Sequence, residues 1–180
     1  MPQHIALLRG LNVGGHRVKM DHLRSLFQEM GHTDVATFIA SGNVIFSSAS
    51  DDVATHEANI ESHLREALGY DVATFIRSPE ELQDVASFEE AGAGRDDSVY
   101  VMFTREPVED GVREALASLE SEMDRFEFRG REIYWLIRGK MSESPLFAGA
   151  LVKVLKDVPH TSRNMTSVRK LLAKHGPGTG

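Results

Sequence analysis

The chain contains no cysteine among its 180 residues. This absence excludes disulfide bonds, thiolate metal sites and a cysteine nucleophile, and it suits a reducing compartment. Long apolar runs are also missing, and no segment has the character of a signal peptide or a membrane span. Hydrophobic content of 41% and charged content of 26% are ordinary for a globular domain. We therefore expect a soluble, cytoplasmic protein without a membrane partner.

Charge is unevenly distributed along the chain. The formal net charge is −7, but residues 1–25 carry +3 and residues 150–180 carry +5, which leaves −15 for residues 26–149. Basic ends of this kind can form an anion-binding face. The alternative is that the acidic helices are solvated and the basic residues lie near helix ends, where surface charge contributes little. Charge alone leaves both interpretations open.

Hydrophobic periodicity predicts a β-α-β-β-α-β order in the first part of the chain. The expected strands are residues 5–8, 34–40, 44–48 and 72–77, and the expected helices are residues 21–30 and 51–68. This order is the split βαβ, or ferredoxin-like, plan.

The second part of the chain repeats much of this plan. A capping box at residues 78–81, with proline at the first helical position, begins a short helix that ends near residue 86. Strands are expected at residues 98–104, 125–128 and 132–137, and helices at residues 112–123, 145–155 and 165–174. We predict an α+β fold of two ferredoxin-like subdomains in tandem, residues 1–77 and 78–180, each with an antiparallel or mixed sheet and helices on one face.

A glycine-rich loop, residues 9–15 (RGLNVGG), follows the first strand and precedes the first helix. Backbone N–H groups often bind phosphate at this position, and Arg9 or Lys19 could supply positive charge. The loop has neither a G-x-G-x-x-G nor a G-x-x-x-x-G-K-[ST] motif, and Asp21 in the first helical turn would repel an anion. The alternative is a structural loop whose glycines adopt positive φ angles.

Two further polar segments have both a structural and a functional interpretation. Residues 41–43 (SGN) fit a tight hairpin turn, and strand directions decide whether this turn lies near the glycine-rich loop. Residues 161–164 (TSRN) precede the last helix, which Asn164 is suited to cap. Arg163 can offer a bidentate donor to phosphate or carboxylate.

The order of these motifs resembles that of a known bacterial family. The motifs are IALLRGLNVGG at residues 5–15, KM at 19–20 before a leucine-rich helix, SGNV at 41–44, and TSRN at 161–164 before the terminal helix. Together they resemble the family catalogued as domain of unknown function 1697. The resemblance implies two ferredoxin-like parts and no established activity, substrate or cofactor. It gives candidate status for ligand binding to Arg9, Asn12, Gly14, Gly15, Lys19, Ser41, Gly42, Asn43, Arg163 and Asn164.

Residue spacing predicts no catalytic motif. The eight histidines include no H-E-x-x-H motif, and His56 and His63 are expected on the surface or the flank of their helix. There is no G-x-S-x-G nucleophile elbow. Trp135 is expected in the core. We predict no metal and no cofactor, and the sequence leaves open whether the protein is an enzyme.

Three classes of function fit these observations. The favoured one is binding of a small anionic or phosphate-bearing ligand in a pocket formed by residues 9–15, 41–43 and 161–164. The second is a protein-interaction or regulatory module without catalysis, whose partner is unknown. RNA binding is the least favoured, because residues 5–8 have no aromatic side chain, residues 44–48 have only Phe46, and the acidic middle of the chain repels phosphate.

Overall fold

The computed structural model describes residues 1–38, 42–89, 97–147 and 149–178. It divides into two compact units: Met1–Asp84 with Leu171–Gly180, and Val85–Lys170. The division falls within two helices, α3 (Pro79–Ala86) and α6 (Met165–His175). From sequence we placed the division after residue 77 and assigned the whole terminal helix to the second part. None of the helices in the described ranges is both long and apolar enough to cross a bilayer.

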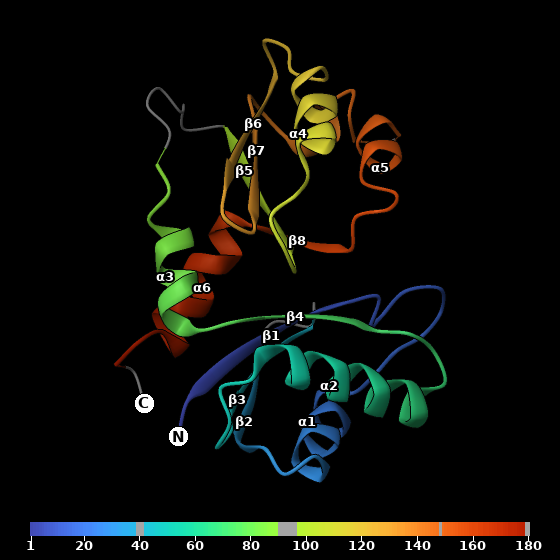
Figure 1. The fold of residues 1–180 in the computed structure, drawn as a ribbon, viewed down its shortest axis with the longest axis vertical. Helices are drawn as coiled ribbons and strands as arrows, with labels where there is room; N and C mark the ends of the chain where they lie inside the picture. The colour runs from blue at the N-terminus through green and yellow to red at the C-terminus, as the bar shows by residue number, and fades with distance from the viewer. Residues whose placement is uncertain (39–41, 90–96, 148, 179–180) are drawn as a thin grey trace. The chain divides into compact units, whose positions relative to one another are not determined.

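The first unit is built on a four-stranded antiparallel sheet with two helices on one face (Figure 1). Its elements are β1 (Gln3–Arg9), α1 (Met20–Glu29), β2 (Thr33–Phe38), β3 (Asn43–Ser47), α2 (Val53–Leu68) and β4 (Ala73–Arg77). The strand order in the sheet is β2-β3-β1-β4, and each neighbouring pair is antiparallel. The unit therefore has the predicted ferredoxin-like topology.

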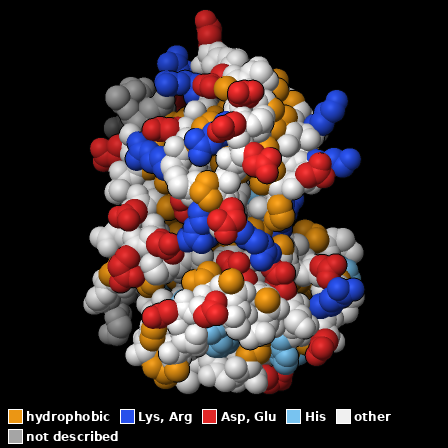
Figure 2. Space-filling model, viewed as in Figure 1, with side chains coloured by type: hydrophobic (Ala, Val, Ile, Leu, Met, Phe, Trp, Pro, Cys, Tyr) orange, Lys and Arg blue, Asp and Glu red, His pale blue; other side chains and the backbone are white. Residues whose placement is uncertain are grey.

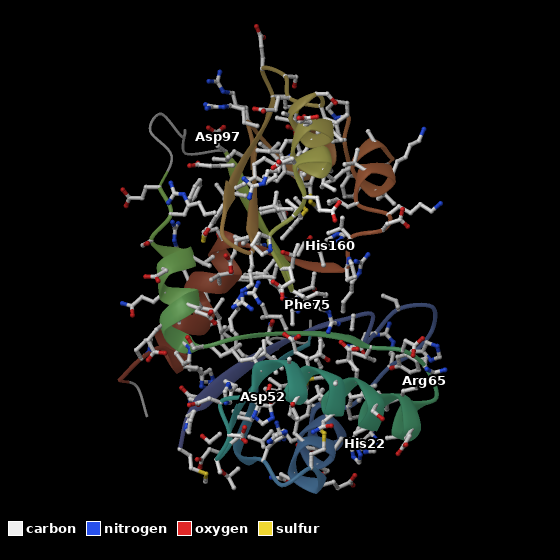
Figure 3. The ribbon with its side chains drawn as sticks, viewed as in Figure 1. His22, Asp52, Arg65, Phe75, Asp97 and His160 are labelled. Atoms are coloured by element: carbon white, nitrogen blue, oxygen red, sulfur yellow. The ribbon has the colours of Figure 1, made fainter. Side chains whose placement is uncertain are left out.

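Both faces of this sheet are buried, and most of their side chains are apolar. One face packs against α1 and α2, and its core includes Ala6, Leu8, Leu23, Phe27, Val44, Phe46, Ile60, Leu64 and Ile76. Ile5, Leu7 and Phe75 alternate with these residues, so they lie on the opposite face and are also buried. Figure 3 shows Phe75 on the side of β4 that faces away from α2. Burial on both faces explains why residues 5–8 form a continuous apolar run instead of an alternating one.

Side-chain capping fixes the N-termini of α2 and α3. The carboxylate of Asp52 accepts a hydrogen bond from the N–H of Thr55 at 3.1 Å and caps α2. The predicted capping box of α3 is confirmed. The N–H of Ser78 donates to the Glu81 carboxylate at 2.8 Å, and the N–H of Glu81 donates to the Ser78 hydroxyl at 3.0 Å.

The second unit has the same topology as the first. Its elements are β5 (Ser98–Thr104), α4 (Asp110–Ala117), β6 (Asp124–Arg129), β7 (Glu132–Ile137), the 3₁₀ turn η1 (Met141–Glu143), α5 (Ala150–Val154), β8 (His160–Asn164) and α6. The strands lie in the order β6-β7-β5-β8, again with antiparallel neighbours. The chain is thus an α+β protein with two ferredoxin-like sheets, as predicted.

Two segments of the second unit differ from the prediction. Residues 161–164, which we expected only as a polar segment before the last helix, lie in the strand β8 (His160–Asn164) because their backbone pairs with β5. The helix expected from residue 145 begins only at Ala150. The Ser144 hydroxyl accepts the N–H of Leu146 at 3.1 Å, and this local hydrogen bond favours a turn where we expected a helix.

Candidate functional site

The glycine-rich loop after β1 and the turn before β3 lie at the same end of the first sheet. Strands β1 and β2 run in the same direction because each is antiparallel to β3. The chain leaves both strands at that end, where the N–H of Leu8 donates to the carbonyl of Gly42 at 2.8 Å. The structure thereby brings together two of the three polar segments that the sequence singled out.

Gly42 is required at this junction for two reasons. Its φ angle is +87°, and a Cβ atom there would lie 3.1 Å from Cβ of Leu8 and 3.3 Å from the Leu8 carbonyl oxygen. Gly15 also has a positive φ angle, +86°, but a Cβ atom there would meet nothing within 4 Å. Comparing substitutions at the two positions therefore separates two free-energy costs: that of a positive φ angle, which both share, and that of steric crowding, which arises only at Gly42.

We expect Gly42→Ala to destabilise the first unit by about twice as much as Gly15→Ala. The left-handed conformation costs an alanine about 1 kcal/mol at either position, and overlap with Leu8 adds at least as much at Gly42. Thermal denaturation followed by far-UV circular dichroism measures both changes. Equal losses in the two variants would show that Leu8 and Gly42 are not held as close together as described.

The tip of the loop is a type I′ turn. The N–H of His16 donates to the carbonyl of Val13 at 3.1 Å, and the two central residues, Gly14 and Gly15, have φ angles of +62° and +86°. A type I′ turn requires positive φ at both central positions, which explains this pair of glycines. The turn alone therefore accounts for these two glycines, without any ligand. A ligand that binds here would contact a turn that is already formed.

Side chains hold the rest of the loop in place. The side-chain oxygen of Asn12 accepts the N–H of Val18 at 2.9 Å, so this candidate residue supports the loop itself. The hydroxyl of Tyr70, which follows the end of α2, donates to the carbonyl of Leu11 at 2.6 Å. The ring of Tyr70 stacks on His16 with centroids 3.9 Å apart. Burial raises the pKa of Tyr70, which keeps its donor proton in place.

Tyr70 and His16 were not singled out from the sequence. Tyr70 is separated from its hydrogen-bond partner by 59 positions, and neither residue belongs to a recognisable motif. The ferredoxin-like order alone indicates that the end of α2 lies at the end of β1 where this loop begins. Figure 1 shows this arrangement in the first unit, and Figure 3 places Arg65 at the same end of α2.

The loop end of the first unit is basic. Residues 9–19 contain Arg9, Arg17 and Lys19, all exposed, and no acidic residue. The nearby carboxylate of Asp71 is paired with Arg65, with 3.5 Å between nitrogen and oxygen. Figure 2 shows basic and acidic side chains interspersed over the visible surface, so charge of one sign does not cover the whole unit. The glycine-rich loop is therefore one stretch of the first unit in which basic side chains are not balanced by acidic ones.

The N-terminus of α1 adds to this positive character. Its N-cap residue, Lys19, makes no side-chain capping hydrogen bond, so the side chain leaves the N–H groups of the first turn available to other acceptors. Asp21, which we expected to repel an anion, forms an ion pair with Arg24. Arg24 also donates to the hydroxyl of Thr37 at 3.1 Å. The repulsion from Asp21 is therefore partly compensated.

Two other predicted residues in the first unit have different positions. Asn43 is buried, and its side-chain N–H donates to the carbonyl of Phe38 at 2.9 Å, so the amide stabilises the hairpin. The carbonyl of Gly42 accepts the N–H of Leu8, and the absence of a side chain allows this close approach. Ser41 lies outside the described residues.

Arg163 and Asn164 belong to the second unit. Nη1 of Arg163 donates to the Thr161 hydroxyl at 2.7 Å and to the Ser162 carbonyl at 2.8 Å, and burial lowers the pKa of Arg163 to about 10. The side-chain oxygen of Asn164 accepts the N–H of Ser167 at 2.7 Å, which confirms the predicted cap of α6. The pocket that would join residues 161–164 to the glycine-rich loop stays a prediction.

Three buried histidines gather at the opposite end of the first unit. Nε2 of His4 and Nε2 of His56 lie 3.2 Å and 2.9 Å from the carbonyl oxygen of Ser50, and the His32 ring centroid is 5.4 Å from that of His56. The expected surface position of His56 is wrong, because this residue is buried against Phe46. Within the described ranges, no group of histidines and carboxylates is arranged to hold a metal ion.

A recess of about 640 Å³ also lies at this end of the unit. It is lined by His4 and, among others, the acidic residues Asp51, Glu80 and Glu81. None of the residues predicted from sequence to bind a ligand lines it. The carboxylates of this recess disfavour an anion. The basic loop is therefore the better candidate for an anion site, although its residues lie on the exposed surface.

Two ferredoxin-like units, each with helices packed on an antiparallel sheet, define the class of α+β protein to which this chain belongs. A family model described as a protein of unknown function, DUF1697, matches residues 1–134. The chain belongs to this family, as the motifs indicated. The matched range contains the whole glycine-rich loop and the turn at Gly42, and it ends before Arg163.

The chain is similar to a solved structure, the conserved bacterial protein SP0830 from Streptococcus pneumoniae. The two share 27% sequence identity with a TM-score of 0.75, over 94% of this chain and 96% of that one. An unknown protein from Galdieria sulphuraria matches over 91% of this chain and 98% of its own, with 15% identity and a TM-score of 0.26, which is too low to support an argument. No curated protein matches the chain.

Proposed function

We propose that the first unit binds a small anionic, phosphate-bearing ligand at its glycine-rich loop. The observation that carries this proposal is that residues 9–19 form a fixed loop with three exposed basic side chains and no acidic one. A preformed site binds more tightly than a mobile one, because less conformational entropy is lost on binding. A cytoplasmic location and a small molecule as partner, instead of a nucleic acid, are part of the same proposal.

The structure supplies donors of the kind that oxyanions prefer. Arg9 and Lys19 flank the loop, and charge-assisted hydrogen bonds to phosphate are stronger than neutral ones. The backbone N–H groups of Gly14 and Gly15 lie at the exposed tip. The N-terminus of α1, directly after Lys19, favours negative charge through the helix dipole. No described group at the loop has an arrangement that identifies a reaction, so the proposal concerns binding.

A thermal-shift titration tests the proposal. Ribose 5-phosphate at about a hundredfold its Kd is expected to stabilise the protein by roughly 2.7 kcal/mol, a Tm increase on the order of 5–10 °C. The double variant Arg9→Ala/Lys19→Ala should lose this increase when the shift of each protein is measured from its own unliganded Tm. Both side chains are exposed and can reach a ligand from solvent. Chloride at equal ionic strength controls for salt.

The matched control is Arg138→Ala, which removes an exposed arginine from the second unit and should keep the full ligand shift. Arg163→Ala measures whether the third polar segment contributes. If the wild-type protein shows no shift, or if the double variant and Arg138→Ala lose the shift equally, the loop is not an anion site. A protein-interaction module would then be the favoured hypothesis, ahead of RNA binding.

A further inference from the structure

The stacked pair of His16 and Tyr70 provides an aromatic surface beside the proposed anion site. The two ring centroids are 3.9 Å apart and the ring planes differ by 19°. Tyr70 is half-buried and its hydroxyl is fixed on the Leu11 carbonyl, whereas His16 is exposed. With Tyr70 on one face, the His16 ring has its opposite face available for a second planar group.

The position of His16 in the chain links this surface to the basic loop. His16 is the last residue of the type I′ turn, and its N–H is held by the carbonyl of Val13 at 3.1 Å. Gly15 precedes it directly and Arg17 follows it. The contacts to a planar ring and to a phosphate would therefore come from neighbouring residues of the chain. One small molecule that carries both groups could reach them together.

We propose that the ligand of the loop is a nucleoside phosphate whose base stacks on His16. This inference rests on the proposed function, because it names the class of anion that the same loop would take. Any base has a flat π face, so stacking on a side-chain ring requires no particular donor pattern. Tyr70 acts as a positioning residue, since it supports the His16 ring from behind and holds the loop through Leu11.

Calorimetric titration of the full chain with two probes tests the inference. Adenosine 5′-monophosphate and ribose 5-phosphate carry the same sugar and phosphate and differ in the base. Base–aromatic stacking predicts that the nucleotide binds about tenfold more tightly than the sugar phosphate. His16→Ala should reduce the affinity for the nucleotide to that for ribose 5-phosphate, while the affinity for ribose 5-phosphate stays unchanged.

Two further variants make this result specific. His16→Phe keeps a flat ring and should retain the tenfold preference, a result that a purely structural role of the His16 side chain would not explain. His63→Ala removes another histidine of the first unit, from α2, and should leave both affinities unchanged.

Equal affinity of the wild-type protein for the two probes would overturn the stacking inference and leave the anion site intact. A nucleotide preference that persists in His16→Ala would overturn it as well, since the base would then be held elsewhere. If neither probe binds, the proposed function itself is wrong. The three outcomes are distinguishable in one set of titrations.

Discussion

Acidification from pH 7 to pH 4 is expected to lower the free energy of unfolding of the first unit by about 3 kcal/mol through His32 alone. Burial lowers the pKa of His32 from its usual 6.5 to about 4. His32 is 8% exposed, its ring centroid lies 4.3 Å from that of Phe46, and both His56 and His4 oppose its protonation. The folded protein therefore holds this imidazole in its neutral form.

The sign of the effect follows from proton binding. Between pH 6.5 and about 4 the unfolded chain binds a proton at His32 and the folded protein does not. Stability is therefore fully present above pH 6.5 and is lost progressively as the pH falls toward 4. His4 acts in the same direction: burial lowers its pKa most, and the Ser50 carbonyl and Asp51 oppose this in part.

Thermal melts across this pH range, followed by circular dichroism, measure the loss. His32→Phe keeps a ring among the aromatic neighbours and removes the titrating group, so its pH dependence should be shallower than that of the wild-type protein. His63→Gln is the matched control, since His63 is not among the buried histidines and lies beside Glu29. An NMR titration that places the native His32 pKa near 6.5 would contradict the prediction.

Much of the fold could be predicted because the periodic segments also form its core. Leu23, Leu26 and Phe27 of α1 repeat at helical spacing and are all buried. The strand β8 could not be predicted in this way. His160–Asn164 contains no apolar side chain, and the segment is extended only because β5 offers backbone partners far away in sequence.

Prediction of the candidate site from the sequence is limited in the same way. The sequence identified the glycine-rich loop and the turn at Gly42 as separate features, because each has unusual turn residues. That they meet depends on the parallel directions of β1 and β2, which are a property of the whole sheet. The support from Tyr70 and the burial of His56 depend on packing between distant segments, for which a single sequence has no periodic signal.

Asp124→Ala is expected to destabilise the second unit by roughly 2–5 kcal/mol. Asp124 is fully buried at the start of β6, and its Oδ1 accepts hydrogen bonds from Nε1–H of Trp135 and from the hydroxyl of Ser144, each at 2.8 Å. Removing the carboxylate leaves both buried donors without this acceptor. It also releases Ser144, which organises the turn before α5 through the N–H of Leu146.

Asp124→Asn distinguishes the effect of losing the hydrogen-bond acceptor from the effect of losing the negative charge. Oδ2 of Asp124 is buried and has no hydrogen-bond partner in the part of the chain that the structure describes. An asparagine keeps one oxygen for Trp135 and Ser144 and places its NH₂ group where no hydrogen bond is lost. We therefore expect Asp124→Asn to retain most of the stability that Asp124→Ala loses, because a neutral amide is less costly to bury than a carboxylate.

Trp135 is the only tryptophan of the chain, so its fluorescence reports on the second unit during urea denaturation. The wild-type protein and Asp124→Asn should show similar midpoints, and Asp124→Ala a clearly lower one. If both variants lost the same stability, the negative charge would matter more than the two hydrogen bonds. Asp124 would then stabilise the second unit mainly through the electrostatic interactions of its carboxylate, and less through the hydrogen bonds that it accepts from Trp135 and Ser144.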